Sequence, residues 1–162
     1  MLAIQTLSDA LLTELSDLLA ARAGWYFPPE RWPELERRIH AAARDFDFTD
    51  IAACIRWLAT SALTPQQAEV LTEHFTVGET YFFREPQALD VFVDHILPAL
   101  IEARQHTTRS LRIWSAACCT GEEPYSLAIL LSTRIPNIQD WQVTIVGTDI
   151  TPRFLRKATA GE

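Results

Sequence analysis

The chain has 162 residues, of which 48% are hydrophobic and 22% are charged, and its formal net charge is −7 at pH 7. This composition is ordinary for a soluble globular protein, and the length allows one domain or one and a half. The negative balance argues against general nucleic-acid binding, which requires a basic surface. The sequence has no apolar run of 18 residues, so we expect no membrane insertion.

The start of the chain and its cysteines predict a cytoplasmic location. The first helix pattern contains acidic residues and follows no basic leader, so it is not predicted to be a signal peptide. Cys54, Cys118 and Cys119 are odd in number, and adjacent cysteines rarely bridge each other, so we expect reduced thiols. No second Cys or His cluster stands at zinc-ligand spacing, and no metal site is predicted.

Four amphipathic helices are predicted in the first part of the chain. The first has leucines at helical spacing and ends at Gly24. The second covers residues 34–44, and the third begins with Thr49 as its N-cap. The fourth begins at Thr64, with Gln67 three residues later completing a capping box. Together these patterns predict a small helical bundle.

The pattern changes after residue 75. Residues 76–85 lack helical periodicity and are predicted to be a connector, and residues 86–104 are predicted to form a helix that Pro98 can kink. Strands and helices then alternate, at 111–116 (strand), about 123–133 (helix), 142–149 (strand) and from Pro152 (helix).

We therefore predict two domains, a helical domain over residues 1–75 and a partial α/β domain over residues 76–162. The fold class is α/β: a small N-terminal helical bundle followed by the truncated start of a Rossmann-like domain. Two parallel strands cannot cover their own faces and edges. If the chain folds alone, its exposed strand edges should favour self-association.

The segment over residues 114–126 carries the most information about function. It joins a predicted strand to a predicted helix, which is the start of a nucleotide-binding α/β unit. Small residues let a ligand approach the backbone, and the helix N-terminus supplies N–H groups. Glu122 and Glu123 disfavour a phosphate here and suit a ligand with hydroxyl and ammonium groups, such as S-adenosylmethionine. Gly121 is the only glycine of the turn, which argues against a dinucleotide site.

Three blocks of sequence resemble the CheR family of chemotaxis receptor methyltransferases. They are the block at residues 114–126, the block at 80–86, which is similar to the family's T-x-F-F-R-E motif, and the block at 146–150. They occur in the family's order, and the resemblance spans nearly the whole chain, most weakly in the first 60 residues. It implies a truncated Rossmann-like methyltransferase domain that binds S-adenosylmethionine and methylates glutamate side chains of chemotaxis receptors.

The resemblance also implies which residues contact the cofactor. Thr80, Arg84 and Glu123 match cofactor-contacting positions of the family. Asp149 follows the second predicted strand, where an acid in α/β nucleotide sites accepts hydrogen bonds from ribose hydroxyls. The alternative for Asp149 is that it caps the helix that begins at Pro152.

Arg84 is also the predicted catalytic residue, because a guanidinium can hold a carboxylate through two hydrogen bonds. That carboxylate belongs either to the cofactor or to the substrate glutamate. The alternative is a structural ion pair with Glu85 or Asp90. The chain departs from the family at Gly78, where members often carry asparagine in an N-x-T pattern, so any side-chain contact of that asparagine is lost.

The predicted reaction needs no strong base, because a glutamate nucleophile is already ionised at neutral pH. Alignment and removal of water from the nucleophile would supply the rate. A domain that lacks half of its pocket should bind cofactor weakly, so we expect no measurable receptor methylation by this chain alone. Two alternatives remain: a receptor- or cofactor-binding regulatory module without catalysis, and a methyltransferase that acts on another substrate.

The expected partner is a methyl-accepting chemotaxis receptor. The second predicted helix and its flanks contain arginines that could face an acidic receptor helix, namely Arg31, Arg37, Arg38 and Arg44. Acidic residues alternate with them, so an ordinary solvated surface of mixed charge is the competing interpretation.

Overall fold

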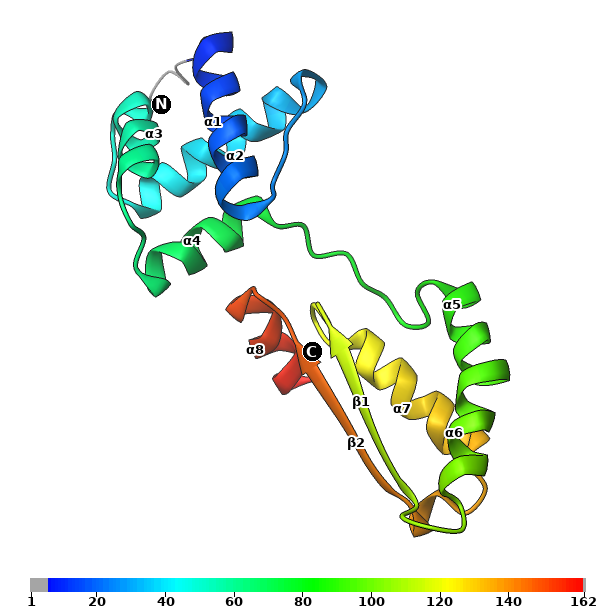
Figure 1. Ribbon diagram of the computed structural model, residues 1–162. Helices are drawn as coiled ribbons and strands as arrows, with labels where there is room; N and C mark the ends of the chain where they lie inside the picture. The colour runs from blue at the N-terminus through cyan, green and yellow to red at the C-terminus, as the bar shows by residue number, and fades with distance from the viewer. Residues whose placement is uncertain (1–5, 162) are drawn as a thin grey trace. The chain divides into compact units, whose positions relative to one another are not determined.

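The computed structural model describes residues 6–161 of the chain. The chain divides into two compact units, Met1–Thr76 and Val77–Glu162. The described part of the first unit is built from helices, and the second unit combines helices with a small parallel sheet (Figure 1). Among residues 6–161, no helix is both long enough and apolar enough to cross a bilayer.

The helices of the first unit begin and end at recognisable capping residues. Gly24 ends the first helix with a left-handed φ of 74°, as expected. Thr64 and Gln67 form the predicted capping box. The third helix begins after Asp50 rather than after Thr49, because the Asp50 carboxylate accepts the Ala52 N–H over 3.0 Å. The helices are α1 (Asp9–Ala23), α2 (Trp32–Asp45), α3 (Ile51–Thr60) and α4 (Pro65–Phe75), with a 3-10 turn at Pro29–Arg31.

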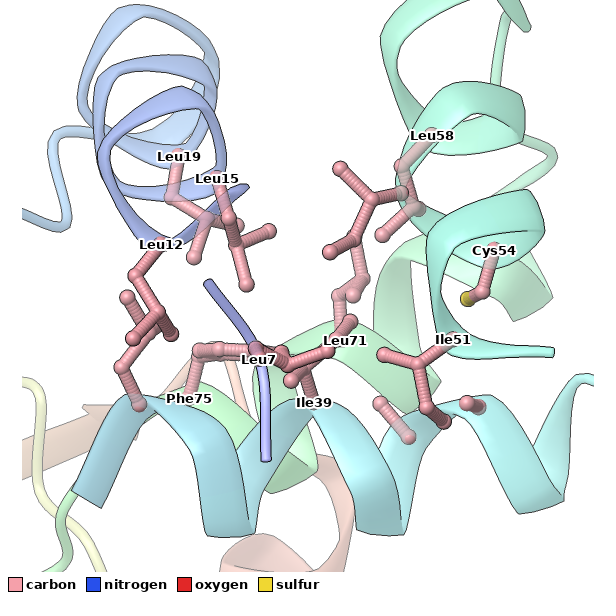
Figure 2. Packing of buried hydrophobic residues seen from close by; sticks show 14 of the residues in the cluster. Leu7, Leu12, Leu15, Leu19, Ile39, Ile51, Cys54, Leu58, Leu71 and Phe75 are labelled. Carbon is pink, nitrogen blue, oxygen red and sulfur yellow. The ribbon is translucent and has the colours of Figure 1, made fainter. Parts of the chain in front are cut away.

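One hydrophobic core holds the first unit together (Figure 2). Leu15 of α1, Ile39 of α2 and Ile55 of α3 are each completely buried. Figure 2 shows the leucines of α1 and the apolar side chains of α3 pointing toward the face of α2 that carries Ile39. Because residues three and four apart share a helix face, the leucine spacing of the sequence becomes one continuous apolar surface.

The second unit alternates helices with two strands, and its first long helical stretch is interrupted. A π-helical turn covers Phe92–Ile96, immediately before the helix that contains Pro98. Proline has no N–H for the carbonyl four residues earlier, so the helical hydrogen bonds shift and the turn widens on its N-terminal side. The elements are α5 (Pro86–Val91), α6 (Leu97–Arg104), β1 (Ser110–Ala116), α7 (Glu122–Arg134), β2 (Gln142–Thr148) and α8 (Pro152–Ala160), with a 3-10 turn at Ile138–Asp140.

The two strands pair in parallel, with Ala116 opposite Thr148 at their carboxyl ends. One face of the sheet packs against helices: Leu111 of β1 lies in a core with Leu97 of α6 and Leu131 of α7. The other face, which we call the open face, carries side chains that alternate with the buried ones; they include Arg112, Trp114, Thr144 and Val146. Parallel sheets are usually covered on both faces, so the open face is unusual.

Candidate functional site

The turn that follows β1 adopts a strained backbone conformation. Ala117 and Cys119 have φ values of 61° and 50°, in the left-handed region that costs a residue with a Cβ about 1 kcal/mol or more. The Cys118 N–H donates to the carbonyl of Thr148 over 2.9 Å, and this bond fixes the turn to the end of β2.

Gly121 completes this turn, and two observations explain why glycine is required there. Its φ is 103°, which a residue with a Cβ rarely adopts. A Cβ at this position would also lie 3.0 Å from the Cβ of Ala158, so the turn packs directly against α8. The predicted strand–turn–helix arrangement is present, with β1, this turn and α7 in order.

Asp149 joins the turn after β1 to the start of α8. Its Oδ2 accepts the Cys119 N–H over 2.9 Å, and its Oδ1 accepts the Thr151 N–H over 2.8 Å. The N-cap of α8 is Thr151, so the alternative that Asp149 caps this helix is wrong; Asp149 instead accepts the N–H of the cap residue itself. Because each carboxylate oxygen has two lone pairs, these bonds are compatible with acceptance of ribose hydroxyl groups as well.

The two glutamates at the start of α7 have different hydrogen-bond partners. Glu123 Oε1 accepts the hydroxyl of Ser115, 2.6 Å away, and Ser115 is a buried residue of β1. Glu122 Oε2 accepts the hydroxyl of Thr120 over 2.7 Å, within the turn itself. Both carboxylates also lie in the first turn of α7, where the helix dipole favours negative charge.

Thr80, Arg84 and Glu123, three of the four predicted cofactor residues, line the same cavity. Asp149 does not line this cavity. It accepts a hydrogen bond from Cys119, and Cys119 belongs to the same turn as Ala117, which does line the cavity. The cavity has a volume of about 70 Å³. Its other lining residues are Glu79, Tyr81, Glu85, Leu89, Ala117 and Ser126.

Arg84 has a different ionic partner from those considered in the sequence. Its Nη1 donates to the carbonyl of Glu79 over 2.7 Å, and its Nη2 lies 3.6 Å from the Glu79 carboxylate. The structural alternative with Glu85 or Asp90 is therefore wrong in its partner, because the connector folds back and brings Glu79 beside Arg84. A guanidinium has five N–H groups, so this pairing does not exhaust its capacity to donate to a carboxylate.

Ser115, Ser126 and Glu79 belong to the site although the sequence analysis did not identify them. Ser115 could have been found from the alternation of β1, which places it on the buried face, where a polar side chain needs a partner. Ser126 stands four residues after Glu122 and donates to its carbonyl over 2.6 Å. No comparable sequence signal identifies Glu79, because its contact depends on how the connector folds.

Two buried thiols, Cys118 in the turn after β1 and Cys54 in the first unit, have a raised pKa. Burial raises the pKa of the Cys118 thiol, and the negative charge of Asp149 raises it further. Burial alone raises the pKa of Cys54 to about 11. Neither sulfur is therefore an activated nucleophile. Within residues 6–161, no cluster of three His, Cys, Asp or Glu side chains is placed to hold a metal ion.

The fold and the site define an α/β domain with acids at the carboxyl ends of two adjacent parallel strands, as in nucleotide-binding proteins. Comparison with protein families agrees: residues 78–162 match the model described as CheR methyltransferase, SAM binding domain. The chain belongs to the CheR methyltransferase family, and the cofactor of the matched domain is S-adenosylmethionine.

Individual relatives are named chemotaxis protein methyltransferases. The chain is 39% identical over 104 residues to a probable chemotaxis protein methyltransferase of Rhizobium etli, covering 64% of this chain and 38% of the relative. It is 33% identical over 129 residues to a chemotaxis protein methyltransferase of Borreliella burgdorferi, covering 78% and 45%. It is 29% identical over 156 residues to that of Escherichia coli, covering 96% and 51%. The matches thus cover about half or less of each relative.

Proposed function

We propose that this chain serves S-adenosylmethionine-dependent methyl transfer to glutamate side chains of chemotaxis receptors, the activity of a protein-glutamate O-methyltransferase. The observation that carries the proposal is that Thr80, Arg84 and Glu123 line one cavity, beside a turn that Asp149 holds in place. The names of the relatives, all chemotaxis protein methyltransferases, support the choice of substrate.

The chemistry of the side chains suits this cofactor. Glu123 and Asp149 would accept hydrogen bonds from its ammonium and ribose hydroxyl groups, while their negative charge disfavours a phosphate. Arg84 would hold a carboxylate, and Thr80 would contribute a hydroxyl beside it. The cofactor supplies a methyl group attached to a positively charged sulfur.

The chain's own residues would act by positioning rather than by acid–base catalysis. A substrate glutamate is already ionised at neutral pH, so no residue needs to remove a proton from it. The strained turn and the carboxylates of Glu123 and Asp149 would hold the ligand in one orientation. Correct orientation of the reactants can lower a reaction barrier by about 7–11 kcal/mol. Arg84 is the residue to which we assign the catalytic role, through its hold on a carboxylate.

The cavity is small for the complete cofactor. Pockets for small molecules measure roughly 300–1,000 Å³, several times the space beside Arg84. We therefore assign the described residues to one part of the cofactor pocket. We expect other residues to line the rest of it, and the relatives contain additional sequence that this chain does not match. Receptor methylation by this chain alone should not be measurable. Methylation without added protein would contradict this expectation.

The receptor-facing surface is a separate part of the proposal. Arg31 and Arg38 both bind the carboxylate of Glu34, at 2.9 and 2.6 Å, which supports a mixed-charge surface for this end of α2. Arg37 and Arg44, on the same helix, are the remaining arginines considered for contact with an acidic receptor helix. We place the protein in the cytoplasm, and its reduced cysteines are consistent with that location.

Self-association through the sheet is also part of the proposal. In the described residues β1 and β2 pair only with each other, so each has an outer edge that another chain could extend. Trp114, which is 72% exposed, and Val146 add apolar area on the open face. Two copies could cover these surfaces mutually.

Binding of radiolabelled S-adenosylmethionine in equilibrium dialysis tests the proposed function. We expect saturable binding, reduced at least about tenfold by Arg84→Ala, which corresponds to one charged hydrogen-bonding group. Arg109→Ala is the matched control, because Arg109 pairs with Asp140 at the opposite end of the sheet. An equal loss of cofactor binding in Arg84→Ala and Arg109→Ala would contradict the proposed site. Cofactor binding without receptor methylation, even after addition of protein that completes the pocket, would favour a regulatory module.

A further inference from the structure

The connector carries Thr80 and Arg84, yet it has no helix or strand to fix them. Residues 76–85 lie between α4 and α5 in the chain and contain no helix or strand. A turn at residues 82–83 is closed by the Arg84 N–H, which donates to the Tyr81 carbonyl over 3.2 Å. A segment of this kind samples many conformations unless other contacts restrain it, and each restrained residue costs about 1–2 kcal/mol of conformational entropy. The contacts that restrain it therefore decide how well the two side chains are placed.

The first contact joins Gly78 to the aromatic ring of Phe154 on α8. A Cβ added at Gly78 would lie 2.6 Å from Cε2 and 2.8 Å from Cε1 of this ring, and closer still to Cζ. The ring thus lies directly against the glycine, in the space that any side chain at position 78 would need. The guanidinium of Arg153 lies 5.3 Å from the centre of the same ring, within the range of a cation–π contact. This contact restricts the motion of the ring.

The second contact joins Phe83 to Ser126 on α7. The Phe83 N–H donates to Ser126 Oγ over 2.9 Å, and the same hydroxyl donates to the Glu122 carbonyl. Ser126 is 1% exposed, so it is a buried residue whose hydroxyl both accepts and donates a hydrogen bond. Phe83 itself has a φ of 57°, a left-handed conformation that only a specific restraint would maintain.

We propose that Phe154 and Ser126 are positioning residues, which fix the connector on both sides of Thr80 and directly before Arg84. This inference rests on the proposed function, because it concerns how that site is held. Phe154 acts two residues before Thr80 by packing on Gly78, and Ser126 acts one residue before Arg84 by holding the Phe83 amide. Gly78 and Phe154 form a matched pair, since a Cβ at position 78 would force the ring to move.

The contact itself can be tested without cofactor. An aromatic ring against a glycine shifts the resonances of the glycine Hα protons, so the NMR signals of Gly78 should be displaced from ordinary values in the full chain. Phe154→Leu should return them to ordinary values, whereas Thr159→Ala, a change at an exposed position of α8, should leave them displaced. Ordinary Gly78 shifts in the unchanged protein would overturn the inference whatever the cofactor does.

The effect on the site is measured by calorimetric titration with S-adenosylhomocysteine. Phe154→Ala and Ser126→Ala should each weaken binding about fivefold, the scale of releasing one restrained residue. Ser132→Ala is the control for the serine, because its hydroxyl bonds within an exposed part of α7. Gly78→Ala should also weaken binding, but Gly78→Ala combined with Phe154→Ala should be no weaker than Phe154→Ala alone, since the clash is then removed.

These outcomes separate the inference from the function. Displaced Gly78 signals together with no binding by any variant would remove the proposed function and leave the contact as a structural one. Displaced signals with unchanged affinity in Phe154→Ala and Ser126→Ala would overturn the positioning role. Far-ultraviolet circular dichroism of each variant distinguishes a lost contact from a lost fold, and Phe154→Leu provides a milder change if Phe154→Ala does not fold.

Discussion

The two units of this chain keep their structure by different means. The first unit has one apolar core to which all four helices contribute, with Leu15, Leu35 and Ile39 completely buried. The second unit has a smaller core on one face of its sheet, and its turns depend on single hydrogen bonds such as those of Asp149 and Ser126. Stability that is spread over a core tolerates change in any one polar group, whereas turns held by a few bonds do not.

The comparison also shows where the candidate site lies. In the described residues, four of the seven left-handed residues other than glycine, Phe83, Glu85, Ala117 and Cys119, lie in or beside the cavity-lining segments of the second unit. The other three are Asp47 in the first unit and Arg109 and Asn137 near the opposite end of the sheet. Strain of this kind persists only where surrounding contacts impose it, and it concentrates at functional sites. The unit with the smaller core is the one that carries the candidate site.

The largest effect is expected from Ile39→Ala in the core of the first unit. Removing a completely buried side chain should lower the free energy of unfolding by about 2–5 kcal/mol. Urea unfolding followed by circular dichroism measures it, with the exposed Arg37→Ala on the same helix as the control. A loss below about 1 kcal/mol would mean that the core is not the main source of stability of this unit.

Asp149→Asn should have the next largest effect, in the second unit. An amide can accept through one atom only, so one of the two backbone N–H groups loses its acceptor, at a cost of about 1–3 kcal/mol. Amide hydrogen exchange at Cys119 and Thr151 should become faster at one or both positions, while exchange within α2 stays unchanged. Unchanged exchange at both amides would show that the carboxylate does not hold the turn.

Glu34→Gln should give a smaller effect that depends on pH. Hydrogen bonds from Arg31 and then Arg38 lower the pKa of Glu34 to about 2, from an ordinary value of 4.5. Because the folded-state pKa is the lower one, the stabilisation is present above pH 4.5 and is lost as the pH falls toward 2. The side chain is partly exposed, so we expect less than about 1 kcal/mol.

Thermal unfolding between pH 2 and pH 6 measures this effect. The stability of the unchanged protein should fall more steeply with acid than that of Glu34→Gln, and Glu30→Gln, a nearby acid, is the control. Parallel curves for the unchanged protein and Glu34→Gln would show that the ion pairs contribute nothing to folding.

Trp114→Ser should change stability least. The side chain is mostly exposed on the open face, so we expect a change within about 0.5 kcal/mol. Self-association, measured by light scattering over a range of protein concentration, should decrease, whereas Thr144→Ser on the same face should not alter it. Identical scattering by Trp114→Ser and the unchanged protein would exclude this face as the surface of association.

The features that could be predicted from the sequence are those that local rules determine. The capping box of Thr64 and Gln67, the end of α1 at Gly24 and the turn at Gly121 each follow from residues a few positions apart. The helix start at Asp50 was missed by one residue, because two neighbouring side chains both suit an N-cap and only the structure shows which one bonds.

The features that could not be predicted depend on the path of irregular segments or on contacts between different elements. The pairing of Arg84 with Glu79 follows from the path of the connector, and the contact of Gly78 with Phe154 joins residues 76 positions apart. The sequence predicts that Gly78 departs from the family, but its packing against Phe154 depends on the position of α8. In the same way, the hydrogen bond from Ser115 to Glu123 joins a strand to a helix across the turn.

Calorimetric titration of the chain with S-adenosylhomocysteine tests the central claim most directly, that the acids after β1 and β2 bind an adenosyl ligand. The account predicts saturable binding, weakened at least about tenfold by Glu123→Gln and by Asp149→Asn, and changed less than about twofold by Glu122→Gln. The last variant is the matched control, because Glu122 neighbours Glu123 and bonds within its own turn. Equal affinities in all four proteins, or the greatest loss in Glu122→Gln, would contradict it.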